Sequence, residues 1–296
     1  MQNHPVRQHW IPKTYLRSFL AAPTEAQQIY ARDLLIGNEF LTSISNVAVM
    51  RHLYTLDAST DSPSYAVESA LCNIEGRFTP VLEKVIQTEE LNLSKDEFEI
   101  FARFLTTLQM RTRQGLAVIQ GYRDEVLATL DSRDRKLPRA HAESLVALNP
   151  EGLREFFARA VISLAPQLST ALLKMNWRLL RTTGQRFITS ENPFIVYHSS
   201  DERWGLATPG AHIQVPLTPR LLLHIASESI IPGKGTFDLV SEAAYALNGL
   251  TLASAEQYIF SSEPFENIRL LVDERPIGKH REFGPIQTMN TCARQT

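Results

Sequence analysis

The sequence predicts an α+β fold with a mostly helical core and a small sheet that is antiparallel or mixed. Apolar residues recur at helical spacing through most of residues 65–177, and short apolar runs separated by proline and glycine follow Gly184. With 296 residues, of which 44% are hydrophobic, the chain is long enough to bury a large core. We expect one elaborated domain over residues 1–273 and a loosely ordered tail over residues 274–296, where the patterning is weak.

The chain opens with an H-x-x-P-x-x-Y-L-x-x-F block at His9, Pro12, Tyr15, Leu16 and Phe19. Pro12 fixes its own φ near about −65° and biases the preceding residue away from helix. We therefore expect His9 to lie in an extended or turn segment, directly before a short helix that carries Tyr15. With an unperturbed pKa of about 6.5, His9 could act as a general base, a metal ligand or a proton donor. A purely structural, hydrogen-bonded histidine is the alternative.

A hairpin and a helix are expected next. Residues 28–33 alternate as a strand does, a turn follows at Gly37, and residues 40–49 supply a second extended segment. From residue 65 the spacing of apolar residues becomes helical, and Pro80 is expected to kink or restart that helix.

The clearest predicted helix begins at Ser94, which is a good N-cap with Glu97 three residues later. Apolar residues then keep helical spacing as far as Val126, so we expect one continuous central helix of about eight turns. The remaining predicted elements are a helix from Pro150 toward Trp177 with an interruption at Pro166, strands at 186–190, 195–198, 213–217, 221–226 and 257–261, and a helix at 238–255.

Composition narrows the classes of function. The formal charge is only −2, so no global field draws the chain to nucleic acid or to an anionic membrane, although a local basic groove stays compatible. The two cysteines, Cys72 and Cys292, are far apart, which argues against a disulfide framework or a cysteine metal site. Without an apolar signal core or a run of about 18 apolar residues, a cytoplasmic protein outside the membrane is expected.

Common catalytic and nucleotide-binding motifs are missing from the sequence. It contains no G-x-x-x-x-G-K-[ST] phosphate loop, no G-x-G-x-x-G fingerprint and no G-x-S-x-G nucleophile elbow. The histidines also lack the H-x-x-x-H spacing of a zinc site.

Two carboxylates stand out on the helix after residue 65. Glu68 and Glu75 are seven residues apart and therefore share a face with apolar residues of that helix. Because burying an unpaired carboxylate is expensive, each needs a cation, a metal ion, several donors or a proton. A buried ion pair that fixes helix packing is the structural alternative. On the central helix, Gln109 and Arg113 are expected to face Glu75 or a bound anion, whereas Arg111 is expected to point elsewhere.

A second polar segment follows the apolar strand that ends near residue 188. Thr189 to Pro193 offers hydroxyls, a carboxylate and an amide, with Ser190, Glu191 and Asn192 as the candidate site residues. Such residues also form Asx and Ser turns that only tie up backbone donors. Asn248, in the later helix, is expected to hydrogen-bond buried backbone.

These separated blocks together resemble the bacterial family called domain of unknown function 4238. The resemblance spans roughly residues 4 to 265. Where many relatives have aspartate, this chain has Glu191, a longer carboxylate that keeps the charge but changes its reach. The family label brings no established reaction, and what it implies is that the separated polar blocks converge in space. The blocks that carry the resemblance are the opening block, Ser43 to Val47 before Tyr54, the helix of Glu68 and Glu75, Gln109 to Arg113, Thr189 to Pro193, and Pro216 to Pro219.

Two functional hypotheses follow, with a structural module of a larger complex as a third. The first is a nuclease-like phosphodiester hydrolase acting on nucleic acid or a nucleotide, which would suit a bacterial effector used against phage. The second is a non-catalytic sensor or adaptor that binds a small ligand or a protein partner; it requires no metal and predicts that Glu75 pairs directly with Arg113. In the hydrolase, His9, Glu75 and Glu191 would be catalytic, Glu68, Glu75 and Glu191 would hold a divalent metal ion, and Tyr15, Gln109, Arg113, Ser190 and Asn192 would bind substrate.

Overall fold

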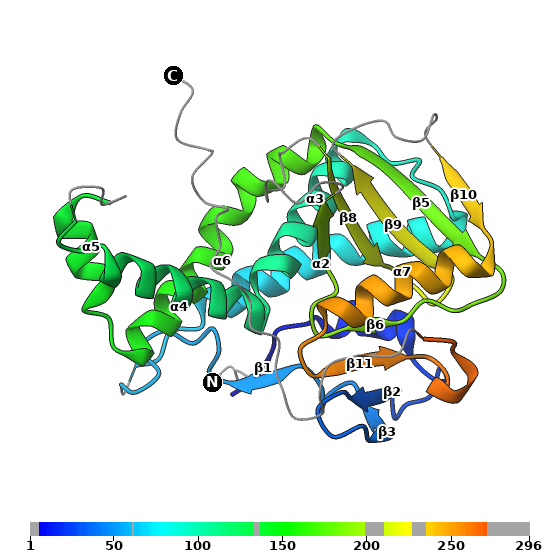
Figure 1. Ribbon diagram of the computed structural model, residues 1–296, viewed down its shortest axis with the longest axis horizontal. Helices are drawn as coiled ribbons and strands as arrows, with labels where there is room; N and C mark the ends of the chain where they lie inside the picture. Colours follow the sequence, from blue (N-terminus) through cyan, green and yellow to red (C-terminus); the bar gives the residue numbers. More distant parts are fainter. Residues whose placement is uncertain (1–5, 61, 133–136, 199–209, 227–234, 271–296) are drawn as a thin grey trace.

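The computed structural model of the chain describes residues 6–60, 62–132, 137–198, 210–226 and 235–270. Within these ranges, α-helices combine with three β-sheets, which confirms the predicted α+β class. Figure 1 shows the largest sheet with helices on both of its sides and the smaller sheets beneath it. The expected tail over residues 274–296 lies outside the described residues.

The largest sheet is mixed. Its strand order is β10–β5–β9–β8–β7, with β10 parallel to β5 and the other neighbours antiparallel. The five strands are β5 (Asn176–Thr182), β7 (Ile195–His198), β8 (Ala211–Pro216), β9 (Leu221–Ala226) and β10 (Thr236–Leu239).

The two smaller sheets are antiparallel and join distant parts of the chain. The predicted hairpin is confirmed as β2 and β3, and β11 and β6 from the second half of the chain extend it in the order β3–β2–β11–β6. The third sheet pairs β1 with β4. These strands are β1 (Arg7–His9), β2 (Gln28–Asp33), β3 (Glu39–Ser43), β4 (Val49–Arg51), β6 (Thr189–Ser190) and β11 (Tyr258–Ser261).

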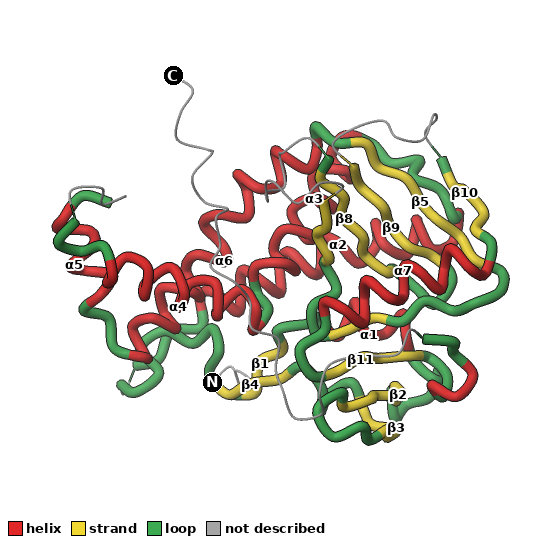
Figure 2. The backbone as a smooth tube through the Cα atoms, viewed as in Figure 1, coloured by secondary structure: helices red, strands yellow, loops and turns green. Residues whose placement is uncertain are grey.

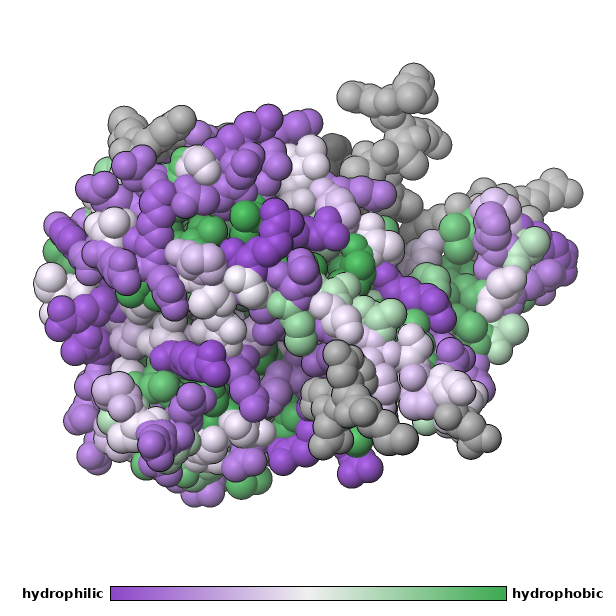
Figure 3. Space-filling view, turned by 180° about the vertical axis from the view of Figure 1, so that it is seen from behind, coloured by the Kyte–Doolittle hydropathy of each residue, from purple (hydrophilic) through white to green (hydrophobic). Residues whose placement is uncertain are grey.

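Helices pack on both faces of the five-stranded sheet. Residues of α2, α3 and α6 share one core with one face of the sheet, and α7 packs against the other face. Figures 1 and 2 show α4 and α5 extending away from the sheets, and Figure 3 shows this projection from behind, with hydrophilic and hydrophobic residues mixed on its surface. The helices are α1 (Lys13–Leu16), α2 (Ala66–Thr88), α3 (Lys95–Met110), α4 (Arg113–Ala128), α5 (Arg139–Val146), α6 (Pro150–Leu173) and α7 (Ser241–Ser254), with short 3₁₀ helices at Arg17–Phe19 and Phe265–Asn267.

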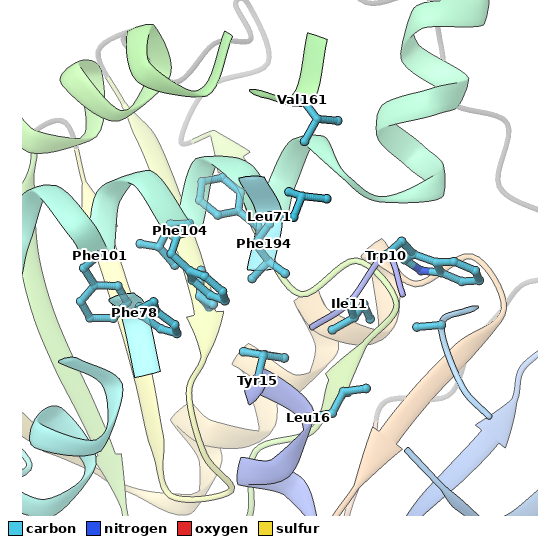
Figure 4. Close-up of a cluster of buried hydrophobic side chains, with 14 of the residues drawn as sticks. Trp10, Ile11, Tyr15, Leu16, Leu71, Phe78, Phe101, Phe104, Val161 and Phe194 are labelled. Atoms are coloured by element: carbon cyan, nitrogen blue, oxygen red, sulfur yellow. The ribbon is translucent and has the colours of Figure 1, made fainter. Parts of the chain in front are cut away.

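The main core holds the amino-terminal block against the helices. Tyr15, Leu16 and Phe19 are fully buried, and Figure 4 shows Tyr15 and Leu16 in the same cluster as the aromatic rings of α2 and α3. Phe78 of α2 and Phe104 of α3 stack with their ring centroids 3.6 Å apart. Because burial of each large apolar side chain contributes about 1.5–3 kcal/mol, this cluster fixes where the opening block lies.

The predicted central helix is two helices. The capping box of Ser94 and Glu97 begins α3 as expected, but the helix ends at Met110 and α4 starts at Arg113. Thr112 caps α4 by accepting a hydrogen bond from the amide of Gly115 at 3.1 Å. A Cβ on Gly115 would lie 2.1 Å from the carbonyl oxygen of Met110, so this corner depends on glycine. The prediction of one continuous helix was therefore wrong.

Two further expectations are corrected near α6. Pro166 does not interrupt the helix, because the Ile162 carbonyl that loses its helical donor accepts a hydrogen bond from Arg103 at 3.2 Å. Pro80 likewise lies inside the unbroken span of α2. The helix toward Trp177 ends at Leu173, and Trp177 belongs to β5 instead.

By length and composition, α6 could cross a membrane, which corrects the expectation that no segment approaches this. It packs against α3 and contributes Phe157, Val161 and Leu172 to the core. Core helices of many folds pass the same test, so length and composition alone decide nothing about a membrane.

Candidate functional site

A buried arginine at the end of α3 joins three parts of the chain. Arg111 donates from Nη1 to Oε1 of Glu75 on α2 at 2.6 Å, and from Nη2 to the carbonyl oxygen of His9 on β1, also at 2.6 Å. The hydroxyl of Tyr54 donates to the Arg111 carbonyl at 2.6 Å, and the guanidinium lies 5.5 Å from the Tyr54 ring centroid. We call these four residues and Glu68 the Arg111 centre.

Arg111 is the cation that faces both carboxylates of the Arg111 centre. Arg111 is 3% exposed; burial by itself lowers its pKa, but Glu75 and Tyr54 outweigh that effect and raise the pKa above its ordinary value. Burial raises the pKa of Glu68, Arg111 opposes this, and Glu75 adds to it. Oε2 of Glu68 is buried without a hydrogen-bond partner among the described residues. Glu68 is thus the carboxylate of this centre that is least satisfied.

His9 enters the Arg111 centre through its backbone. Its ring Nδ1 lies 3.1 Å from the carbonyl oxygen of Val47, so the ring donates there and Nδ1 carries the proton in the neutral tautomer. Burial, then Lys13, lowers the pKa of His9 to about 4. The imidazole is therefore neutral at pH 7, and its ring hydrogen bond is to Val47 and not to Glu75.

Arg111, and not Arg113, is the partner of Glu75. The break between α3 and α4 turns the chain after Met110, so that Arg113 leaves the face that a continuous helix would share with Gln109. Arg113 instead lies over the ring of Trp10, 5.9 Å from its centroid. Oε1 of Gln109 is buried without a hydrogen-bond partner in the described part of the chain. The expected pairing of Glu75 with Arg113 and the expectation that Arg111 points elsewhere were both wrong.

A second polar centre, the Tyr15 centre, consists of Tyr15, Thr189 and Pro216. The Tyr15 hydroxyl donates to the Pro216 carbonyl at 2.5 Å and lies 2.8 Å from the Thr189 hydroxyl. Burial raises the pKa of Tyr15, and the bond to Thr189 only partly opposes this. The phenol is therefore a neutral hydrogen-bonding group that ties the opening block to β6 and to the end of β8.

Glu191 holds the loop before β11. Its Oε1 accepts hydrogen bonds from the backbone amides of Glu256 at 2.5 Å and Gln257 at 2.6 Å, and Oε2 accepts from the amide of Tyr258. Burial raises the pKa of Glu191 to about 7, although the three amide donors oppose this. All the partners are backbone groups, which is the arrangement expected for a structural turn.

Ser190 and Asn192 serve the same turn. The hydroxyl of Ser190 accepts from the amide of Asn192 at 3.1 Å, and the Asn192 side chain donates to the carbonyl of Ser254 at 3.2 Å. Both residues are buried. These contacts agree with the turn interpretation, and none of them is to a residue of the Arg111 centre.

A family model described as "Protein of unknown function (DUF4238)" matches residues 7–264. The chain belongs to this DUF4238 family. The match spans the Arg111 centre, the Tyr15 centre and the Glu191 turn, so all three lie in the part that defines family membership. No curated protein and no solved structure matches the chain.

In this DUF4238 protein the expected metal ligands are not brought together. Among the described residues no group of three His, Cys, Asp or Glu side chains could hold a metal ion. Glu68 and Glu75 share the Arg111 centre, whereas both oxygens of Glu191 are engaged by backbone amides. The physical reason is that each charge is answered locally, that of Glu75 by Arg111 and that of Glu191 by three N–H donors.

The DUF4238 blocks converge, but into two centres and not one. His9, Glu75 and the end of α3 meet in the first, and Tyr15, Thr189 and Pro216 meet in the second. The sequence analysis missed Arg111 and Tyr54 as members. Tyr54 follows the Ser43 to Val47 segment in the sequence, and its place in one of the blocks that carry the family resemblance was the available signal.

Proposed function

We propose that this chain is a non-catalytic binding protein, a sensor or adaptor whose buried polar centres specify its fold. One observation carries the proposal: both terminal nitrogens of Arg111 are bound inside the protein, to Glu75 and to the carbonyl of His9. An arginine that stabilises charge developing on a phosphate must offer its nitrogens to the substrate. Arg111 instead joins three elements of the fold.

The states of the other candidate catalytic groups support the same proposal. The Glu191 carboxylate accepts three backbone hydrogen bonds, and the His9 ring is neutral and bonded to Val47. Metal-assisted hydrolysis would need several side-chain ligands converging on one ion, and no three His, Cys, Asp or Glu side chains among the described residues form such a group. Direct pairing of Glu75 with an arginine is what the sensor or adaptor hypothesis requires, with Arg111 in the place of Arg113.

The phosphodiester hydrolase is the competing hypothesis, and Glu68 is the residue that favours it. One oxygen of Glu68 is buried without a hydrogen-bond partner among the described residues, and its pKa is raised by burial. Such a carboxyl group is a candidate general acid or base. A cytoplasmic setting with a nucleotide or nucleic acid as partner belongs to this hypothesis.

One experiment separates the two hypotheses. Wild-type protein and the variants Glu75→Gln, His9→Ala and Glu99→Gln are incubated with bis(p-nitrophenyl) phosphate and single-stranded oligonucleotides, with and without Mg²⁺ or Mn²⁺. Thermal unfolding of each protein is measured in parallel. We expect that none of the proteins cleaves either substrate above the buffer background. Of the two glutamate variants, only Glu75→Gln should have a lower unfolding temperature, because Glu99 is half exposed and forms a weak pair with Lys95. Cleavage by wild type that Glu75→Gln abolishes at unchanged unfolding temperature would establish the hydrolase instead.

A further inference from the structure

A third polar cluster lies on the five-stranded sheet, far in sequence from the Arg111 centre. Strand pairing places His224 on β9 opposite both Arg178 on β5 and Gln214 on β8, and places Tyr197 on β7 opposite His212 on β8. Residues opposite each other in antiparallel strands share a face, and so do residues two apart along a strand. All five side chains therefore project from one face, and we call them the Arg178 cluster.

The face is the one that α7 covers. The side-chain amide of Gln214 donates to the carbonyl of Leu247 at 2.9 Å and to the hydroxyl of Thr251 at 3.2 Å, and both partners belong to α7. Farther along the same face the rings of the cluster pack together. Nδ1 of His212 lies 3.2 Å from Nε2 of His224, and the Tyr197 ring stacks on His212 with centroids 5.0 Å apart and planes 12° apart.

Arg178 is the charge of this cluster, and no described residue answers it. Its side chain is 1% exposed, its Nε and Nη1 are buried without a hydrogen-bond partner, and no salt bridge in the described ranges includes it. Burial lowers the pKa of Arg178 and Tyr197 opposes this, but a guanidinium stays protonated at any physiological pH. Arg111 has a similar burial, but both of its terminal nitrogens are bound, to Glu75 and to the carbonyl of His9. Arg178 differs from it in having no acidic partner among the described residues.

A histidine of the Arg178 cluster also has a polar atom without a hydrogen-bond partner among the described residues. Nδ1 of His224 is also buried without a partner among the residues described. If Nδ1 of His212 donates to Nε2 of His224, then Nδ1 of His224 carries a proton that it can donate beside Arg178. Burial, then Arg178 and His212, lowers the pKa of His224 to about 4, so the ring is neutral at pH 7 and Arg178 supplies the positive charge.

We propose that the Arg178 cluster binds an oxyanion, a phosphate or carboxylate group of a small ligand, with Arg178 as the charged donor and His224 as the neutral donor. A buried unpaired cation is among the most costly groups in a fold, and an anion supplies both the missing charge and the missing acceptors. A metal cation does not suit the cluster, because the arginine repels it and the two imidazoles bind each other. The inference rests on the proposed function in one respect, since it names the ligand class of the binding protein.

The test uses the full chain with inorganic phosphate and acetate as probes in a buffer otherwise free of oxyanions. Binding is followed by isothermal titration and by the rise in unfolding temperature with ligand concentration. The key variant is Arg178→Gln, and the matched control is Arg220→Gln, which removes one positive charge from an exposed residue. We expect wild type and the control to bind phosphate, acetate or both, and Arg178→Gln to bind at least tenfold more weakly.

The unfolding temperature without ligand gives an independent readout. Because Arg178 has no partner to lose among the described residues, Arg178→Gln should unfold at the wild-type temperature or above it, whereas a variant of Arg111, which pairs with Glu75, should unfold earlier. Early unfolding of Arg178→Gln, or equal phosphate and acetate affinity in wild type and variant, would overturn the inference. The inference would also be overturned if wild type bound neither phosphate nor acetate.

A second variant tests the neutral donor of the cluster. His224→Gln leaves the guanidinium in place and removes the imidazole donor, so phosphate or acetate affinity should fall severalfold and not vanish. Unchanged affinity in His224→Gln would remove His224 from the site and contradict the cluster as proposed. Failure of the proposed function can be told apart from failure of the anion-binding inference. Phosphodiester cleavage would contradict the proposed function whatever Arg178 binds, whereas a lack of anion binding would leave the non-catalytic assignment unchanged.

Discussion

Arg111 and Glu75 form an ion pair across 2.6 Å that ties the end of α3 to the middle of α2. The arginine is buried and the glutamate is one-fifth exposed. Since the other terminal nitrogen of Arg111 binds the carbonyl of His9, the pair also holds the strand that precedes the opening helix. Removing either partner leaves a charge in a place that water reaches poorly.

Glu75→Gln should therefore lower the free energy of unfolding by about 1–3 kcal/mol, less than for a fully buried pair because Glu75 is partly exposed. Urea unfolding measures this, with Glu99→Gln as the control that stays within about 0.5 kcal/mol of wild type. The double variant Glu75→Leu with Arg111→Met should lose less than the sum of the single variants. Full additivity would show that the two side chains do not interact.

Tyr15→Phe should cost about 1–2 kcal/mol of stability, because it leaves the buried Pro216 carbonyl without its donor and the Thr189 hydroxyl without its partner. Thr189→Val in the Tyr15→Phe background should then cost less than in wild type. Tyr30→Phe serves as control, since no hydrogen bond of the Tyr30 hydroxyl occurs among the described residues. Equal losses for both tyrosine variants would contradict the role of the Tyr15 centre.

Gly115→Ala should destabilise the protein by about 2 kcal/mol or more, because its Cβ would meet the Met110 carbonyl oxygen at 2.1 Å. Gly121→Ala in the same helix should raise stability by about 0.5–1 kcal/mol, because nothing lies within 4 Å of the new Cβ and alanine favours helix. Denaturant midpoints of the two variants compare them directly. A neutral Gly115→Ala would mean that the corner before α4 does not need glycine.

His9 should make the free energy of unfolding depend on pH in the acidic range. Its pKa is 6.5 in the unfolded chain and about 4 in the native state, so the unfolded state binds more protons between these values. The contribution of His9 is therefore present above pH 6.5 and lost as the pH falls toward 4. His9→Gln should remove that slope when unfolding free energies of variant and wild type are subtracted at each pH. His141→Gln, an exposed control, should leave the slope unchanged.

Glu191 should act in the opposite direction. Its native pKa of about 7 lies above the ordinary 4.5, so between these values the native state binds more protons than the unfolded state. Stability from this group is present below pH 4.5 and declines as the pH rises through 7. Subtracting the curve of Glu191→Gln from that of wild type should reveal this decline, and the exposed Glu266→Gln should not show it. A flat difference would place the native pKa of Glu191 near its ordinary value.

The sequence predicted local structure correctly where residues close together along the chain determine it. The capping box of Ser94 and Glu97 begins α3 as predicted, because both partners lie within one turn. Asn248, expected to serve buried backbone, accepts from the amide of Ile188 and donates to the carbonyl of Arg186. The short α1 after Pro12 and the hairpin of β2 and β3 were predicted for the same reason.

The spacing of residues along the chain did not reveal where a helix ends or which strands pair. Apolar periodicity runs through Met110 and Arg113 without a gap, so the steric corner at Gly115 was invisible and the wrong arginine was paired with Glu75. His212 and His224 are twelve residues apart, which looks unlike any ligand spacing. The antiparallel register of β8 and β9 nevertheless brings their rings to within 3.2 Å.

By itself, the sequence determined the fold class, the family and the fact that its polar blocks meet, because composition, periodicity and capping act over short distances along the chain. Only the tertiary structure decided which partner each charge has. An ion pair or an unpaired buried arginine depends on where two distant backbones come to lie within about 3 Å, and that is set by packing of the whole core. For this reason Arg111 has an acidic partner, whereas Arg178 has none in the part of the chain that the structure describes.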